Sequence, residues 1–370
     1  MSLSELTVDD LRCIEHAELE LHPSQNLISG GNGSGKTSLL ESIFLLGRGR
    51  SFRTRNSERL IRYGRDRLVV FGRVAAVSDP PAGSSTSHHH GGLPVGVQVS
   101  RADGTIARIG GESAKSLTEL TQAFPVQVID PGIHKLVEEG GFRRRRWMDW
   151  GVFHVEHQFG EWWVRYSRAL KQRNAALRSQ PAQASAWDLE LVRLGELIAE
   201  ARARFVEDLL PYWRESVLAL SGLEPELHYF KGWAQDASLA QALVASKTRD
   251  EARRLTHPGP HRADIVVRLN GRPAREVLSR GQQKLVAVAL TLAQLNLLQA
   301  ATQTTPTLLL DDPAAELDGE HLRRFIEQVA RLRSQLILTS LHPESHLFGT
   351  PDRVFHVEQG RVQSAGRGSV

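Results

Sequence analysis

The sequence lacks the cysteines that a disulfide needs. Cys13 is the only cysteine among the 370 residues, so no disulfide can form within the chain. This excludes a small scaffold held together by disulfides and favours a reducing compartment. The first residues, "MSLSELTVDDLR", carry acids where a signal peptide has basic and then apolar residues. We therefore expect a cytoplasmic protein.

The sequence also lacks long hydrophobic runs and has little lysine. No stretch of about 18 apolar residues is present, the length that a membrane-spanning helix requires. Only seven of the 46 basic residues are lysine, and the formal net charge is +4. The excess of arginine has two interpretations, a coding bias of a GC-rich gene and recognition of phosphates by guanidinium groups. Composition does not separate them.

Alternating polar and apolar residues predict strands near the N-terminus. The expected elements are a hairpin over 3–21, a buried strand over 25–30, a helix over 36–47, and strands over 66–77 and 93–111. Asp103-Gly104 is the expected turn of the last pair. Residues 78–92 are low in complexity, and no carboxylate or cysteine stands next to His88 to His90. We interpret this segment as a flexible hairpin loop and not as a metal site.

The middle of the chain is helical in pattern and holds all seven tryptophans, from Trp147 to Trp233. Helices are expected over 155–178 and 186–210, the second closed by Pro211. No heptad pattern persists, so we expect a compact insert and not a long coiled coil. We expect the tryptophans to pack in its core, and the alternative, that they stack on DNA bases, is less favoured. Strand character returns over 263–277 with a turn at Asn270-Gly271, and the rest alternates helix and strand.

The sequence therefore predicts an α/β nucleotide-binding domain that both ends of the chain build and a helical domain interrupts. The expected boundaries are 1–135 for the first half, 136–245 for the helical lid and 246–370 for the second half.

A phosphate-binding loop is present between the expected strand and helix. "GGNGSGKTS" matches G-x-x-x-x-G-K-[ST], and its context makes a chance glycine-rich turn a poor alternative. The nucleotide-binding residues are expected to be Gly30, Gly31, Asn32, Gly33, Ser34, Gly35, Lys36, Thr37 and Ser38. Lys36 is expected to reach the β and γ phosphate oxygens of ATP, and the Thr37 hydroxyl to bind Mg²⁺.

An acidic pair ends a buried strand near the C-terminus, in "PTLLLDDPAAELD". Asp311 is expected to hold Mg²⁺ at the carboxyl edge of the sheet, where α/β proteins place their ligands. Asp312 stands where such ATPases usually carry a catalytic glutamate. Because aspartate is one methylene shorter, and a misplacement of about 1 Å can cost ~100-fold in rate, slow hydrolysis is predicted. The alternative interpretation of the acids is a helix-capping turn.

The segment "LSRGQQK" resembles the signature turn L-S-G-G-Q of ABC-type ATPases, and "AELD" resembles their D-loop, with Glu316 and Asp318. In that superfamily the signature turn caps the ATP of a partner subunit, so that two ATPs lie at a two-fold interface. The resemblance assigns this role to Ser279, Arg280, Gly281 and Gln282. The turn also opens an apolar helix, whose N-terminus favours anions, and an N-cap serine is the plainer interpretation.

Over nearly its whole length the chain resembles the bacterial RecF family of recombinational-repair ATPases, which belongs to the ABC/SMC-like superfamily. The stretches that carry this resemblance are "GGNGSGKTSLLESI", "GRGRSFRT", "FRRRRWMDWGVFH", "LKQRNAALR", "GPHRADI", "LSRGQQK" and "LLLDDPAAELD". It implies an ABC-type P-loop ATPase head, with a mixed sheet and an antiparallel β lobe, interrupted by a helical lid. It also implies a weak DNA-dependent ATPase that forms an ATP-bound homodimer on single-stranded, gapped or junction DNA. RecR and RecO would be its partners in loading RecA.

Two departures from the superfamily pattern bear on the site. A histidine usually follows the strand after the D-loop, but here Thr339 and Ser340 stand there and His342 comes two residues late. This again favours slow hydrolysis. Gln127, in "PVQVIDP", is a candidate metal-contacting residue.

Clustered arginines are expected to contact DNA or, for those just after the phosphate-loop helix, DNA or the nucleotide; surface exposure and ion pairing within the protein are the alternatives. The candidates are Arg48, Arg50, Arg53, Arg143, Arg144, Arg145, Arg146 and Arg262. Two other functions remain open at this stage. One is an ABC transporter subunit, disfavoured by the arginine-rich blocks and the large insert; the other is a structural DNA-binding module in which ATP is a vestige.

Overall fold

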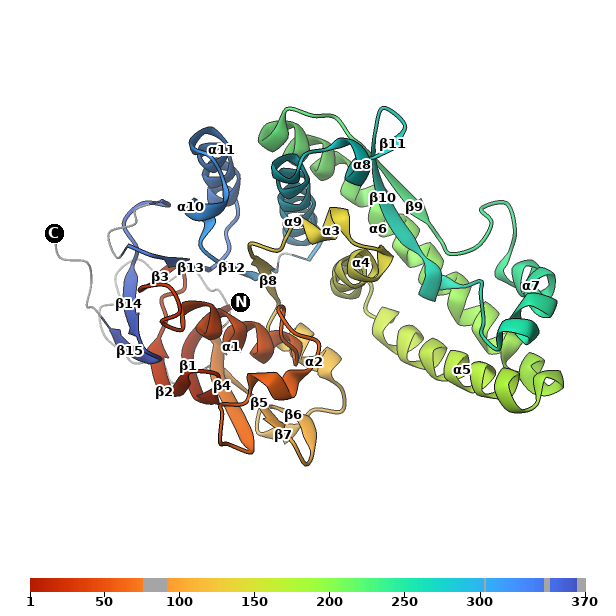
Figure 1. The fold of residues 1–370 in the computed structure, drawn as a ribbon, viewed down its shortest axis with the longest axis horizontal. Helices are drawn as coiled ribbons and strands as arrows, with labels where there is room; N and C mark the ends of the chain where they lie inside the picture. Colours follow the sequence, from red (N-terminus) through yellow and green to blue (C-terminus); the bar gives the residue numbers. More distant parts are fainter. Residues whose placement is uncertain (76–91, 303, 343–346, 365–370) are drawn as a thin grey trace. The chain divides into compact units, whose positions relative to one another are not determined.

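The computed structural model describes residues 1–75, 92–302, 304–342 and 347–364. They form two compact units, Met1–Pro131 with Thr304–Val370, and Gly132–Gln303 (Figure 1). Both ends of the chain therefore build the first unit. The loop predicted over 78–92, with its three histidines, lies almost entirely outside the described residues.

The second predicted boundary, at residue 246, falls inside the second unit. Residues 246–303 belong there because their strand and long helix pack on other helices of that unit. That these residues serve the ATPase function stays a prediction.

The first unit contains two six-stranded sheets. The antiparallel sheet has the order β2-β1-β4-β5-β6-β7, and the predicted N-terminal hairpin is confirmed, with Val8 opposite Ala17. The predicted turn at Asp103-Gly104 is confirmed: it joins β5 to β6, and Gly104 lies in the left-handed region at φ 71°. The strands are β1 (Ser2–Leu11), β2 (Ile14–Glu20), β4 (Arg67–Ala75), β5 (Leu93–Ser100), β6 (Gly104–Ile109) and β7 (Glu112–Ser113).

The mixed sheet has the order β15-β14-β3-β13-β12-β8, and all its pairs are parallel except β14 with β15. All residues of β3, β12 and β13 are buried, as expected for central strands covered on both faces. The strands are β3 (Gln25–Ser29), β8 (Val126–Ile129), β12 (Thr307–Leu310), β13 (Leu336–Ser340), β14 (Arg353–Glu358) and β15 (Arg361–Ser364).

Helix α1 (Lys36–Arg48) lies between the two sheets and is buried along its length except at Thr37 (Figure 1). Its apolar residues form one core with both sheets. A Cβ at Gly47 would lie 2.5 Å from the carbonyl oxygen of Phe124, so a side chain there would push the helix away from the mixed sheet. The remaining helices of this unit are η1 (Ser57–Leu60), α2 (Leu117–Ala123), α10 (Pro313–Glu316) and α11 (Gly319–Ala330).

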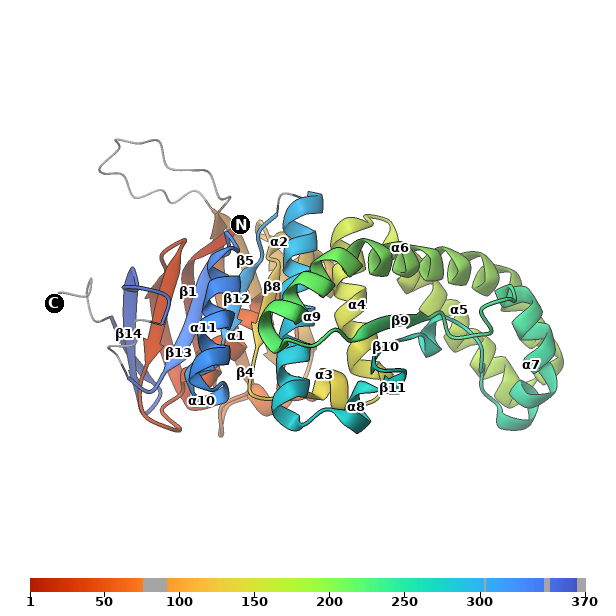
Figure 2. The same ribbon diagram turned by 90° about the horizontal axis from the view of Figure 1, so that it is seen from above.

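The second unit is mostly helical, as predicted, with a three-stranded antiparallel sheet of order β11-β10-β9. Helix α6 packs along α9 and α5, and α7 contacts both α5 and α6 (Figure 2). The predicted turn is confirmed, with Asn270 and Gly271 both at positive φ. The elements are α3 (Lys135–Glu138), α4 (Gly141–Val155), α5 (Phe159–Ser179), η2 (Pro181–Trp187), α6 (Asp188–Ser221), β9 (Glu226–Phe230), α7 (Leu239–Arg253), η3 (Pro260–Arg262), β10 (Asp264–Leu269), β11 (Arg272–Pro273), α8 (Ala274–Val277) and α9 (Arg280–Thr302).

The prediction that Pro211 closes a helix is wrong. Helix α6 passes through Pro211 and ends only at Ser221. An interior proline removes one backbone hydrogen bond and costs about 3 kcal/mol. The turns beyond it bury Trp213, Val217 and Leu220, and burying three such side chains contributes more than that cost.

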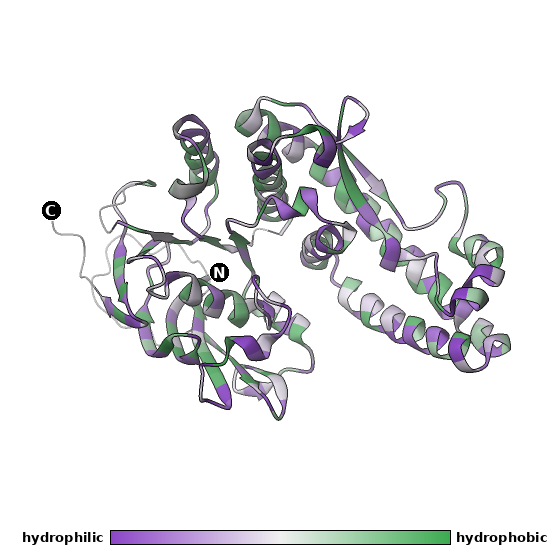
Figure 3. Cartoon of the chain, in the orientation of Figure 1, coloured by the Kyte–Doolittle hydropathy of each residue, from purple (hydrophilic) through white to green (hydrophobic). Residues whose placement is uncertain are grey.

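Helix α9 is long and apolar enough to cross a membrane by length and composition alone, and Figure 3 colours most of it as hydrophobic. Most of its apolar stretch is buried, and it packs against α3, α4 and α6. Its Gln294 donates from Nε2 to the carbonyl oxygen of Trp147. These are the contacts of a core helix.

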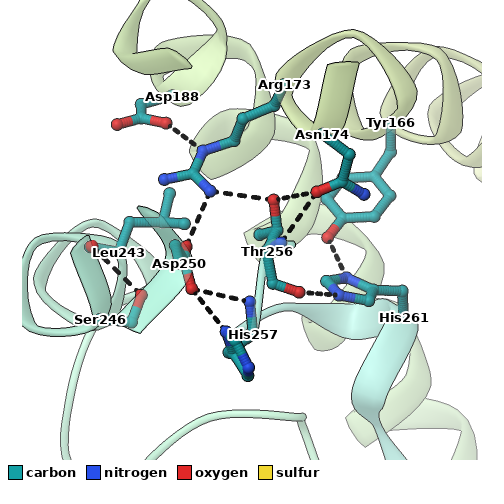
Figure 4. A network of polar contacts seen from close by, with 10 residues as sticks. All are labelled: Tyr166, Arg173, Asn174, Asp188, Leu243, Ser246, Asp250, Thr256, His257 and His261. Atoms are coloured by element: carbon teal, nitrogen blue, oxygen red, sulfur yellow. Dashed lines mark hydrogen bonds and ion pairs between the residues drawn. The ribbon is translucent and has the colours of Figure 1, made fainter. Parts of the chain in front are cut away.

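A polar network ties α5 to α7 and to the loop that precedes β10 (Figure 4). The guanidinium of Arg173 donates to the carboxylates of Asp188 and Asp250, at 2.7 Å each, and to the hydroxyl of Thr256. His261 lies nearby, with Nδ1 2.7 Å from the hydroxyl of Tyr166 and Nε2 3.1 Å from the carbonyl oxygen of Thr256. Because a carbonyl only accepts, Nε2 carries the proton, and Nδ1 accepts from the tyrosine hydroxyl.

Burial and the positive charges of Arg262, Arg145 and Arg202 together lower the pKa of His261 to about 4, against the opposing effect of the hydrogen bond to the Thr256 carbonyl. A neutral imidazole is therefore part of the folded unit, whereas the unfolded chain takes up a proton near pH 6.5. The stability that this group contributes is complete above pH 6.5 and is lost as the pH falls towards 4.

We expect the helical unit to lose roughly 2 kcal/mol more stability between pH 7.5 and 5 in the wild type than in His261→Gln. Glutamine can donate to Thr256 and accept from Tyr166 but does not titrate there. Urea unfolding followed by tryptophan fluorescence measures this, because all seven tryptophans lie in that unit. An equal loss in both proteins would contradict the assignment.

Candidate nucleotide site

The loop between β3 and α1 is held by the neighbouring strands. The Gly30 N–H donates to the carbonyl oxygen of Ser340, and the Gly360 N–H donates to that of Ser34. A Cβ at Gly30 would lie 2.2 Å from the carbonyl oxygen of Val357, so only glycine allows this approach. Gly35, the N-cap of α1, has φ 120°, a conformation that L side chains avoid. The sequence predicted this loop correctly from its glycine spacing.

Lys36 is folded into this loop. Its Nζ donates to the carbonyl oxygens of Gly30 and Gly31 at 2.6 and 2.9 Å, and the residue is buried. Burial lowers its pKa, and the nearby carboxylates of Asp312 and Asp311 oppose that shift. The Lys36 ammonium group therefore lies between the loop carbonyls and two acids, Asp311 and Asp312. The sequence predicted that these acids belong to the same site as Lys36.

The hydroxyl of Thr37 meets the carboxylate of Asp311. Thr37 Oγ1 lies 3.1 Å from both carboxylate oxygens, although 274 residues separate the two positions. Thr339 Oγ1 donates to the Oδ1 of Asp311 at 2.9 Å, and Thr339 Oγ1 also accepts from the N–H of Asp312 at 2.8 Å. The predicted pair of magnesium ligands is therefore brought together.

Strand register explains this arrangement. Strands β12 and β13 are parallel with Leu310 opposite Leu338, so the next residue of each, Asp311 and Thr339, meet at the carboxyl edge of the sheet. Strand β3 lies on the other side of β13 and delivers the loop to the same edge. This is the edge at which parallel α/β sheets bind ligands.

Asp312 has a left-handed backbone, with φ 48° and ψ 56°. Such a conformation is costly for a residue with a side chain and is held only where the surroundings impose it. Here the hydrogen bond from its N–H to Thr339 does so. Its carboxylate makes no capping bond to α10, so the helix-capping interpretation does not describe its side chain.

The residues present fit a nucleotide phosphate and Mg²⁺. The Ser34 hydroxyl is buried without a hydrogen-bond partner among the described residues, in a loop that opens a buried helix and exposes Gly31, Asn32 and Gly33. Thr37 and Asp311 offer the oxygen ligands that Mg²⁺ prefers, and Lys36 and the loop N–H groups would hold phosphate oxygens. Bound there, Mg²⁺ would neutralise charge on the β and γ phosphates.

Thr339 and Glu41 are contributions that the sequence did not reveal. The sequence showed Thr339 only as the absence of a histidine. Glu41 is fully buried on α1 and binds Arg12, Arg53 and the Ser51 hydroxyl. The only sequence feature that could have indicated a role for Glu41 was its position one helical turn beyond the loop.

Gln127 and His342 make other contacts. Gln127 is buried, and its Oε1 accepts from the guanidinium of Arg48 at 3.1 Å. His342 is exposed, and its N–H donates to the hydroxyl of Ser340. Neither of these contacts involves Lys36, Thr37 or Asp311.

The signature segment lies in the second unit, with Ser279, Arg280 and Gly281 exposed. Ser279 Oγ accepts from the Gln282 N–H at 3.3 Å, and Gln282 Oε1 accepts from the Ser279 N–H at 3.0 Å. This reciprocal capping box is the plainer interpretation of the serine. It uses only an acceptor position of the hydroxyl, so the hydroxyl hydrogen remains available for a phosphate oxygen.

In the segment that resembles a D-loop, Asp318 caps α11. Its Oδ1 accepts from the His321 N–H, and its Oδ2 lies 2.6 Å from His321 Nδ1. The hydrogen bond from the His321 side chain lowers the pKa of Asp318. The side chain of Glu316 lies outside the described residues, so its role stays a prediction.

Two of the eight arginine candidates are buried in contacts within their own units. Arg48 donates to Gln127 and to the carbonyl oxygen of Val126. Arg144 forms a two-pronged ion pair with Asp264, at 2.8 Å for each contact. For these two arginines the contacts match the alternative to DNA binding, in which ion pairs or hydrogen bonds hold the side chains within the protein.

The other six candidates vary in exposure. Arg143 pairs with Glu139, Arg145 donates to a backbone carbonyl, and Arg146 lies over the ring of Phe142. Arg53 and Arg262 are exposed and Arg50 is partly exposed. Their contact with DNA stays a prediction.

Cys13 can report on this site. It is exposed, its Sγ lies 4.0 Å from the Ser38 hydroxyl, and a Cβ at Gly35 would lie 3.1 Å from that sulfur. We expect Mg²⁺ and ATP to slow maleimide labelling of Cys13 several-fold, measured by intact mass, since no other thiol exists. Lys36→Ala is the control that should label equally fast with and without nucleotide. Unchanged labelling of the wild type would place the nucleotide elsewhere.

Comparison with known proteins places this site in a family. The profile of the "RecF/RecN/SMC N terminal domain" family matches residues 2–363. Proteins called "DNA replication and repair protein RecF" are similar over nearly the whole chain. That of Shewanella sp. (strain MR-4) is 38% identical over 98% of this chain and 99% of its own, and that of Cellvibrio japonicus (strain Ueda107) is 39% identical over the same shares.

Solved structures agree. The structure of "the recombination mediator protein RecF-ATP in RecFOR pathway" is 25% identical, covers 99% of this chain and 98% of that chain, and has a TM-score of 0.87. An Smc head bound to the C-winged helix domain of ScpA, 15% identical with a TM-score of 0.56 over 99% and 97% of the two chains, shares the fold alone. The predicted ABC/SMC-type head is thus confirmed, and the chain belongs to the RecF family.

Proposed function

We propose that this protein is an ATP-dependent DNA-binding protein of recombinational and replication-gap repair. The observation that carries the proposal is the meeting of Thr37, Asp311 and Thr339 beside Lys36 at the carboxyl edge of the mixed sheet. Relatives in the family are called DNA replication and repair proteins, and a solved relative is described with ATP. Family membership removes the reason for the transporter alternative.

The proposed cycle begins with ATP and Mg²⁺ at the phosphate loop. Two ATP-bound chains then pair, each presenting the exposed Ser279 and the N-terminus of α9 to the partner's γ phosphate. The capping box supports this role because it fixes the serine while its hydroxyl hydrogen stays available. ATP binding is thereby coupled to closure around DNA.

Hydrolysis is proposed to be weak and DNA-dependent. Asp312 is one methylene shorter than the usual glutamate, and Thr339 occupies the region where the superfamily places a histidine. Thr339 orders Asp311 and Asp312 but has no group that titrates near neutral pH. Slow turnover would let the ATP state persist on DNA until partners arrive.

The proposed setting is the cytoplasm, at single-stranded, gapped or junction DNA, with RecO and RecR as partners in loading RecA. The basis for these partners is that a solved relative is assigned to the RecFOR pathway. A structural module in which ATP has no role is the competing outcome of the tests below.

Light scattering tests the ATP-bound dimer. With Mg²⁺ and a slowly hydrolysed ATP analogue we expect a dimer, and without nucleotide a monomer. Ser279→Asp should stay monomeric, because aspartate caps a helix as well as serine does but repels a phosphate. Ser279→Asn keeps the cap without the charge and should still dimerise to a measurable extent. If the mass is the same with and without nucleotide, the ATP-dependent dimer is contradicted, whereas the assignment of the phosphate-binding loop is not affected.

Thr339→Val tests the hydroxyl that joins the two acids. Valine has the same shape but removes one of the two hydroxyl donors to Asp311, leaving that of Thr37, and removes the hydroxyl that accepts from the Asp312 N–H. We expect ATP turnover to fall by about 10- to 100-fold, as for other residues that orient metal ligands, with the Mg²⁺ needed for half-maximal rate increased. Thr339→Ser should restore most of the rate. A wild-type turnover above on the order of 10 s⁻¹, a typical enzyme value, would contradict the slow-hydrolysis proposal.

A further inference from the structure

Helix α5 carries a charge pattern that the nucleotide site does not use. Between Glu161 and Asp188 the chain has five basic residues and no acidic one. Two of the five are engaged within the helical unit: Arg165 pairs with Glu190, and Arg173 is the centre of the network in Figure 4. The pattern leaves three cations to be explained.

Those three, Arg168, Lys171 and Arg178, are exposed and make no hydrogen bond or ion pair among the described residues. Their spacing of three and seven residues places them on one face of the helix. The buried residues of α5, such as Tyr166 and Ala169, lie on the opposite face. The outer face of α5 is defined here as Arg168, Lys171 and Arg178.

Acids on the elements packed against α5 do not neutralise this face. Asp188 and Asp250 point to Arg173 (Figure 4), and Glu190 holds Arg165 and Arg193. The segment η2, which also contacts α5, contains no acid. Three positive charges therefore remain uncompensated along one surface.

The dimensions suit a polyanion. Arg168 and Arg178 are ten residues apart, about 15 Å along the axis at ~1.5 Å per residue. Between them only the small side chain of Ala175 is also exposed near the centre of the face, so nothing bulky keeps a ligand away. Duplex DNA presents one phosphate charge per ~1.7 Å of its axis, so a row of cations of this length can meet several phosphates at once.

We propose that the outer face of α5 binds the phosphate backbone of DNA, without reading its sequence. This rests on the proposed function, in which the protein binds DNA, and it adds the element that makes the contact. When lysine and arginine side chains without a protein partner contact phosphates, they release counterions condensed on the DNA. The affinity gained in this way falls steeply as the salt concentration rises.

The test is the triple variant Arg168→Gln, Lys171→Gln, Arg178→Gln. Its binding to a fluorescent duplex is measured by anisotropy, with Mg²⁺ and a slowly hydrolysed ATP analogue, over a series of salt concentrations. Each phosphate contact contributes about 0.9 to the slope of log K against log salt, so the slope should become less steep by roughly 2 to 3. Glutamine keeps the helix propensity, and the nucleotide-dependent mass should not change.

A matched control removes three other exposed cations of the same unit that make no hydrogen bond or ion pair among the described residues, with Arg214→Gln, Lys247→Gln and Arg249→Gln. It should keep the wild-type slope. If the control lowers the slope equally, or if the α5 variant keeps it, the inference is overturned while DNA binding stands. If the wild type binds no DNA in any nucleotide state, the proposed function fails, and the inference fails with it.

Discussion

The nucleotide site of the first unit depends on one contact, the hydroxyl of Thr37 against the carboxylate of Asp311. The contact requires β3, β13 and β12 to lie parallel and in one register, because a shift by one residue would turn Asp311 and Thr339 to opposite faces. Burial of α1 between two sheets fixes the other side of the contact. The core, the strand register and the loop together therefore position the side-chain oxygens of Thr37, Asp311 and Thr339.

The local features of this site could be predicted from sequence. Glycine spacing, a buried strand before the loop and a strand that ends in Asp311 depend on short-range chemistry, and the structure brings them together. Thr339 could not be predicted, because its role follows from which residue of β13 lies beside Asp311. A pattern that expected histidine there gave no reason to assign a hydroxyl the role of joining two acids.

Where the sequence misled, tertiary packing outweighed a local rule. Pro211 predicted a helix end, but the apolar residues beyond it carry α6 onward. All four arginines from Arg143 to Arg146 were candidates for DNA contact, yet a helix turns successive side chains in different directions. Arg144 therefore enters the interior and pairs with Asp264, while its neighbours stay near solvent. A run of consecutive arginines in a sequence does not show which of them faces the protein interior.

The long separation between Thr37 and Asp311 also has a consequence for how the protein is made. The phosphate loop leaves the ribosome 274 residues before its acidic partner, a delay on the order of tens of seconds at about 5–20 residues per second. During that time α1 lacks β12, β13 and β14, the strands that later cover it. A half-made chain therefore cannot assemble an ATP site. The apolar residues of α1 stay uncovered until those strands are made, and transiently exposed apolar surface favours aggregation.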